Sequence, residues 1–167
     1  MKTTITYVKT AFSKNAIIAF LGILPVFYAA KTNAQAGVTK YGTGALTNNS
    51  VNGNYNSAFG YYSLNRNTSG YYNSANGANA LRSNTTGYSN TAGGYSSLYK
   101  NTTGYYNTGY GAFSLYSDTA GSHNTAGGYA SLYFTTGSYT TGYGAYSLYN
   151  NTTASYNTGY GAYSLYS

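Results

Sequence analysis

Leucine marks a regular period along most of this chain. Successive leucines are separated by 18, 17, 17, 17, 17, 16 and 17 residues, and a glycine lies four residues before each of them. The leucines are Leu46, Leu64, Leu81, Leu98, Leu115, Leu132, Leu148 and Leu165. The residues between them are mostly Asn, Ser, Thr, Gly, Ala and Tyr, so each unit has one large aliphatic side chain. A period of this length indicates a solenoid, in which every unit forms one coil against its neighbours.

The residue types within the unit favour strands and turns over helices. Seventeen residues are too few for a pair of packed helices, and Gly, Asn, Thr and Tyr suit short strands and turns. We expect strands of four or five residues in segments such as "NTAGG" and "ASLY", with glycines at corners that need positive φ or a close backbone approach. The predicted fold class is all-β, a parallel β-roll or β-solenoid of about eight 17-residue coils.

Stacked coils place equivalent residues above one another, about 4.8 Å apart. The asparagine that precedes each core segment therefore predicts a ladder of amides hydrogen-bonded along the axis. Alanine or glycine two residues later keeps the interior narrow. Charge is nearly absent because a charge repeated in every coil would repel its copies. The ladder asparagines are Asn56, Asn73, Asn90, Asn107, Asn124 and Asn157.

One leucine per coil provides only a small hydrophobic core. A fully buried leucine contributes roughly 1.5–3 kcal/mol, whereas fixing the backbone of one residue costs about 1–2 kcal/mol, so we expect further burial from the tyrosines or from a second chain. Two alternatives stay open: the leucines face symmetry mates around a threefold axis in a homotrimer, or they fill each coil's own interior. This candidate core or trimer row is Leu64, Leu81, Leu98, Leu115, Leu132, Leu148 and Leu165.

A tyrosine directly follows each of the last five leucines. In an extended segment neighbouring side chains point to opposite faces, so these tyrosines lie outside if the leucines lie inside. A row of exposed phenols offers rigid contact area that is enriched at binding surfaces and suited to stacking on sugars. The alternative is that the rings only stabilise the sheet by cross-strand contacts. This candidate adhesive face is Tyr99, Tyr116, Tyr133, Tyr149 and Tyr166.

The first 36 residues differ in composition from the repeats. Three lysines precede the uncharged run "AIIAFLGILPVFYAA", and "AQA" at 34–36 is a small-x-small pattern that signal peptidase accepts. The run contains Pro25 and is shorter than the roughly 20 apolar residues that span a bilayer, which disfavours a transmembrane anchor. We therefore expect a secretory signal peptide at 1–36 and a secreted repeat domain at 37–167, without membrane insertion of the mature chain.

Composition excludes most kinds of chemistry. The chain has one acidic residue, Asp118, one histidine, His123, and no cysteine, so we expect no catalytic residue, no cofactor, no metal site and no enzyme activity. The "GYGAFS" segment lacks the third glycine of a dinucleotide loop. Removal of residues 1–36 leaves four basic residues and Asp118, a net charge of +3. These scattered cations form no stripe along a phosphate backbone, so we expect no nucleic acid partner.

The stretch "GYSNTAGGYSSLYKNTTGYYNTGYGAFSLYS", residues 87–117, resembles a known family. It is similar to the YadA-like head repeats of trimeric autotransporter adhesins, and especially to the NTAxGxxALxxNTTG arrays of Bacteroidetes-type surface proteins. The resemblance covers about Tyr41 to Ser167. It implies a left-handed parallel β-roll in which three chains assemble side by side, secretion to the bacterial cell surface, and adhesion to host matrix, abiotic surfaces or neighbouring cells.

The expected function is that of a secreted, non-catalytic surface adhesin head. Such a head binds surfaces, matrix proteins or glycans through many weak contacts, whose avidity grows with the number of repeats and chains. The alternative is a structural extracellular fibre or matrix protein built from stacked coils. Ice binding by a threonine face is disfavoured, because the paired threonines are adjacent and a strand would send them to opposite faces. The candidate threonines are Thr85, Thr102, Thr119, Thr135 and Thr152.

Overall fold

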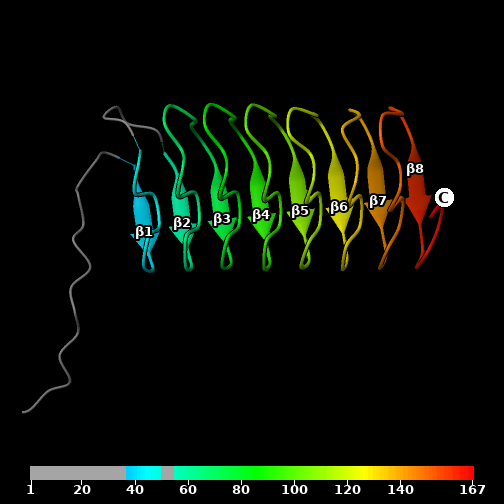
Figure 1. Cartoon of the computed structure of the whole chain (residues 1–167), viewed down its shortest axis with the longest axis horizontal. Coiled ribbons are helices and arrows are strands. Elements are labelled where there is room, and N and C mark those ends of the chain that lie inside the picture. Colours follow the sequence, from blue (N-terminus) through cyan, green and yellow to red (C-terminus); the bar gives the residue numbers. More distant parts are fainter. Residues whose placement is uncertain (1–36, 50–54) are drawn as a thin grey trace, which may run out of the picture. The chain divides into compact units, whose positions relative to one another are not determined.

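The repeats form a parallel β-solenoid in a computed structural model, which describes residues 37–49 and 55–167. Eight strands lie in one sheet in the order of the sequence, and each pairs in parallel with the next (Figure 1). The strands are β1 (Thr39–Tyr41), β2 (Ser57–Phe59), β3 (Ser74–Asn76), β4 (Thr91–Gly93), β5 (Thr108–Tyr110), β6 (Thr125–Gly127), β7 (Thr141–Tyr143) and β8 (Thr158–Tyr160). Paired residues follow the leucine period, as in Thr91↔Thr108 between β4 and β5. The predicted fold class is confirmed, while the predicted signal peptide lies outside the described residues.

The strands are shorter than predicted, and the second predicted strand is a turn. Each strand has three residues, and the "ASLY" segment at 130–133 forms a turn. Leucines in this part of the coil have a left-handed backbone, with φ of 52° at Leu98 and 50° at Leu115. Residues other than glycine rarely adopt this region. The neighbouring coil holds the conformation, because the Leu98 N–H donates to the Ser114 carbonyl at 2.9 Å.

The leucines from Leu64 to Leu148 lie inside the chain itself, whereas Leu165 in the last coil is 57% exposed. Every leucine from Leu64 to Leu132 is fully buried, and Leu148 is 3% exposed. They form one cluster with the alanines at the centres of the strands, such as Ala92 and Ala126. The leucines from Leu64 to Leu148 therefore fill each coil's own interior, which was the second of the two alternatives for this row. A second chain is therefore not required to cover them.

Buried asparagines join successive coils, as predicted, although their main partners are backbone groups. The Asn90 Oδ1 accepts the backbone N–H of Asn107 at 2.9 Å, and its Nδ2 donates to the Gly104 carbonyl at 2.8 Å. The same two kinds of bond recur at Asn56, Asn73, Asn107 and Asn124. Each amide thus satisfies two backbone groups that would otherwise be unpaired in the interior.

A second row of buried amides begins each "NTTG" segment, where residue types had indicated only a turn. Asn84 donates through Nδ2 to the Oδ1 of Asn67 at 2.7 Å, and Asn101 donates in the same way to Asn84 at 2.7 Å. Asp118 takes the next place in this row and is fully buried. The Asn101 Oδ1 is buried without a hydrogen-bond partner, so the acidic residue interrupts the row.

Gly94, four residues before Leu98, meets both predicted needs, whereas Gly87, which ends an "NTTG" segment, meets only that of a close backbone approach. Gly94 has φ of 137°, and a Cβ there would lie 2.7 Å from the Gly111 carbonyl carbon. A Cβ on Gly87 would instead meet the Asn84 side chain and the Gly104 carbonyl oxygen. Glycine at the end of the "NTTG" segment is therefore required by the close approach of the coils.

Candidate functional site

The tyrosines that follow the leucines form a continuous stack along the solenoid. The ring centroids of Tyr99 and Tyr116 are 5.1 Å apart with an interplanar angle of 7°. The next three pairs, which end at Tyr166, have centroid distances of 4.9, 5.1 and 5.2 Å. We call these five residues the tyrosine ladder. The structure thus brings together all five residues that the sequence predicted as an adhesive face.

The tyrosine ladder is less exposed than predicted. Its members from Tyr99 to Tyr149 are half-buried, although the leucines beside them point inward. Because each ring stacks on the next, a ligand that approaches from solvent meets ring edges and hydroxyl groups rather than ring faces. Desolvation raises the pKa of the Tyr133 phenol, and the neighbouring phenols of Tyr116 and Tyr149 raise it further. This hydroxyl is therefore a neutral donor and acceptor at physiological pH.

Other aromatic rows were missed by sequence reasoning. His123 stacks on Tyr139 with ring centroids 4.6 Å apart, and Tyr139 stacks on Tyr156 at 5.1 Å. The strands carry a further row, in which Tyr143 and Tyr160 stack at 5.5 Å and are both exposed. The recurrence of Tyr, Phe and His at other fixed places of the period was the signal that could have revealed them. His123 is thus half-buried in an aromatic stack rather than isolated on the surface.

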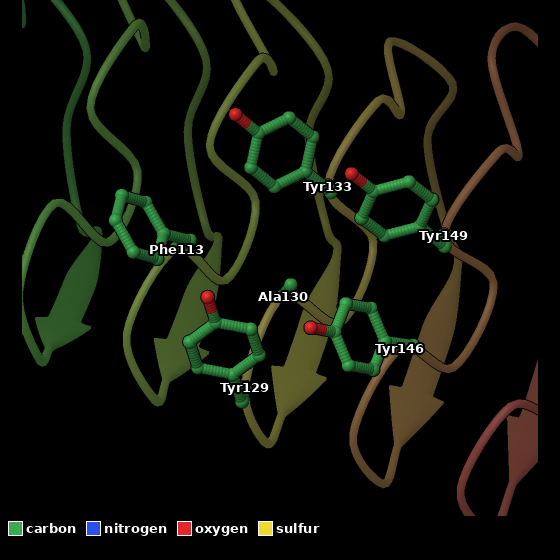
Figure 2. A pocket seen from close by; sticks show the side chains of 6 residues that line it. All are labelled: Phe113, Tyr129, Ala130, Tyr133, Tyr146 and Tyr149. Carbon is green, nitrogen blue, oxygen red and sulfur yellow. The ribbon is translucent and has the colours of Figure 1, made fainter.

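A hollow lies beside the tyrosine ladder where the aromatic pattern is interrupted. Phe113, Ala130 and Tyr146 occupy the same place in three successive coils, two residues before the leucine. The alanine leaves a space of about 210 Å³, which we call the Ala130 hollow (Figure 2). Its lining residues are Phe113, Tyr129, Ala130, Tyr133, Tyr146 and Tyr149. Two ladder tyrosines therefore form one wall of this hollow.

The threonines considered for ice binding do not present a regular array of free hydroxyl groups. The Thr85 Oγ1 donates to the Thr102 carbonyl at 3.0 Å, and the Thr102 Oγ1 donates to the Thr119 carbonyl at 2.9 Å. Thr135 is fully buried. The Thr85 and Thr102 side chains join the coils and use their hydroxyl donors, whereas the Thr135 hydroxyl is buried without a hydrogen-bond partner.

The outer faces carry many rings and hydroxyl groups and a few cations, such as Arg66 and Lys100. Residues 37–49 and 55–167 contain no group of three or more potential metal ligands. Within the same ranges, no helix combines the length and the apolar character needed to span a bilayer. The arrangement can bind by aromatic contact and by neutral hydrogen bonds.

The chain was compared with protein-family models, curated proteins and solved structures, and none of them matches. The resemblance to YadA-like head repeats thus has no family match behind it. The structure itself is a parallel β-solenoid with coils about 17 residues apart and a tyrosine-rich surface.

Proposed function

We propose that this protein is a secreted, non-catalytic surface adhesin head that binds surfaces, matrix proteins or glycans through repeated weak contacts. The observation that carries the proposal is the tyrosine ladder, which presents the same group at each of five successive coils. Weak sites on one rigid support bind with an avidity far above that of each site alone. Stacking fixes the rings before binding, so little side-chain entropy is lost when a ligand is contacted.

The C-terminal part of the tyrosine ladder, which has no charged side chain against its rings, supports a neutral target. The guanidinium of Arg82 lies 5.8 Å from the Tyr99 ring centroid, and the Lys100 ammonium lies 5.6 Å from that of Tyr116. Both cations flank the N-terminal end of the tyrosine ladder. From Tyr133 to Tyr166 the ladder itself offers only rings and phenol hydroxyls, which suit hydroxyl-rich or weakly polar surfaces.

Export to the bacterial cell surface and assembly into a homotrimer are parts of this proposal. Three copies of the tyrosine ladder in one particle would raise avidity further. Because the leucines are buried within each chain, contacts between chains would use surface side chains. Sedimentation of residues 37–167 measures the assembly directly, and a stable monomer would remove the trimer.

The experiment that tests the proposal replaces Tyr99, Tyr116, Tyr133 and Tyr149 together by serine. We expect retention of residues 37–167 on glycan-coated, matrix-coated and plain polymer surfaces to fall by more than any single replacement causes. Circular dichroism at the assay temperature shows whether the variant is still folded, which separates a lost contact surface from unfolding.

A matched control replaces Tyr110, Tyr143 and Tyr160 by serine. These tyrosines are exposed on strands β5, β7 and β8, outside the tyrosine ladder. The control should keep its retention on coated surfaces. An equal loss in both variants would show that tyrosine content, and not the ladder, causes adhesion. If the parent shows no retention on any surface but assembles into fibres, the structural alternative replaces this proposal.

A further inference from the structure

The Ala130 hollow lies where one coil carries an alanine and the coils on either side carry an aromatic ring. Phe113, Ala130 and Tyr146 have φ of 60°, 51° and 56°, so their coils share one backbone conformation and two of the three carry a ring. Tyr146 stacks on Tyr163 with centroids 5.1 Å apart. In the other direction along the row the next residue is Ala130, which is 2% exposed, and the Tyr129 ring lies against Tyr146 at a centroid distance of 5.3 Å. A single six-membered ring is therefore the natural size of occupant.

The walls of the hollow are aromatic and are held by ring contacts. Tyr129 makes edge contacts with Phe113 and with Tyr146, at centroid distances of 5.8 and 5.3 Å. On the opposite wall Tyr133 and Tyr149 stack at 5.1 Å. A ligand that enters finds these walls already in place, so the cost of ordering them is small.

The polar groups of the hollow are neutral hydroxyls. Tyr129, Tyr133, Tyr146 and Tyr149 each supply one, and the lining contains no charged side chain. Figure 2 shows the Tyr146 hydroxyl on the side of Ala130. Desolvation raises the pKa of the Tyr146 phenol, and the nearby phenols of Tyr129 and Tyr163 add to the effect. The Tyr146 hydroxyl therefore stays protonated and can both donate and accept.

We infer that the Ala130 hollow binds one neutral pyranose ring of a glycan. A pyranose has C–H faces that pack on aromatic rings and a rim of hydroxyl groups that matches the phenols. The volume of about 210 Å³ is below the roughly 300–1,000 Å³ of sites for drug-sized ligands, which suits one sugar unit. An aromatic side chain of a partner would also fill the space but would leave most of the phenols unmatched. This inference rests on the proposed function and names its ligand class.

The Ala130 methyl group provides a direct probe of binding. Residues 37–167 with ¹³C-labelled alanine methyls are titrated with methyl β-D-glucopyranoside, methyl β-D-galactopyranoside and methyl α-D-mannopyranoside. We expect the Ala130 signal to shift and saturate with a Kd on the order of 1 mM for at least one of them. The signal of Ala92, which is buried in the interior, should not move.

Two variants and one control test the position of the site. Ala130→Tyr fills the hollow with a residue that the same backbone position already accepts at Tyr146, and it should abolish binding in ligand-observed saturation transfer. Tyr146→Phe keeps the ring, as at Phe113, and should weaken binding about fivefold through the loss of one hydroxyl. Asn76→Tyr adds a tyrosine to the exposed row on strand β3 and should leave binding unchanged.

Three results would overturn the inference. These are the absence of saturation with every glycoside, unchanged glycoside binding by Ala130→Tyr, and binding of p-cresol without binding of any glycoside, which would assign the hollow to an aromatic side chain. The same parent protein is assayed for retention on coated surfaces. Persistent retention without glycoside binding would leave the proposed function intact, whereas loss of retention as well would remove both.

Discussion

The Oδ1 atom of Asp118 accepts the backbone N–H of Gly121 at 2.7 Å, in the row where the preceding coils have a buried asparagine. Its second oxygen accepts the Nδ2–H of Asn124 at 3.0 Å. Burial raises the pKa of the Asp118 carboxyl to about 6, although the hydrogen bonds from Asn124 and Gly121 lower it in part. The folded chain therefore binds a proton at Asp118 more tightly than the unfolded chain does.

Stability should depend on pH through this one carboxyl. Because the folded pKa lies above the unfolded one, the free energy of unfolding should fall by about 3 kcal/mol as the pH rises from about 4 to about 6, and then level off. Asp118→Asn should remove this change and stabilise the domain at neutral pH, since its Nδ2 can donate to the unpaired Asn101 Oδ1. Thermal melts of both proteins across this pH range measure the effect. Parallel pH profiles for the two would contradict it.

Each buried asparagine should contribute more to the free energy of unfolding than the small size of its side chain suggests. Asn107 accepts the N–H of Asn124 at 2.9 Å and donates to the Gly121 carbonyl at 2.7 Å. Asn107→Ala leaves both backbone groups buried and unpaired, so we expect the free energy of unfolding to drop by about 2–4 kcal/mol. Asn150→Ala changes an exposed asparagine and should stay within about 0.5 kcal/mol of the parent. Chemical denaturation would contradict the prediction if the two variants were equally stable.

Leucine replacement should unfold the coils rather than separate chains. Leu98 is fully buried in its own coil, so Leu98→Ala should lower the free energy of unfolding by about 2–5 kcal/mol. Leu165→Ala is the matched control, because Leu165 is 57% exposed. Sedimentation below the melting temperature should give the parent's mass for both variants. A folded protein of lower mass with Leu98→Ala would place this leucine at an interface instead.

The coil arrangement could be predicted because it depends on spacing alone. The leucine period gave the number of coils and the parallel register, and the recurring residue before each strand gave the buried asparagines from Asn56 to Asn124. A ladder of side chains on a solenoid needs only identical spacing. The alignment of the tyrosines at 99, 116, 133, 149 and 166 could therefore also be predicted.

Conformation within the coil could not be predicted, because it depends on bonds to the next coil. Nothing in the residue type of Leu98 or Tyr146 favours positive φ, yet both adopt it, with φ of 52° and 56°. For the same reason the second strand was expected where a turn occurs. The Ala130 hollow was also missed, since it arises from one small residue between rings of neighbouring coils and has no motif of its own.

The central claim is that adhesion is the product of repeated weak contacts along the tyrosine ladder. It is tested most directly by removing the ladder tyrosines one at a time, from Tyr99 to Tyr149, and measuring the dissociation constant on one coated surface. If each ring contributes about 1 kcal/mol, affinity should fall roughly fivefold per replacement while the circular dichroism spectrum stays that of the parent. A dissociation constant that does not change with the number of tyrosines removed, or that collapses at a single one, would contradict the account.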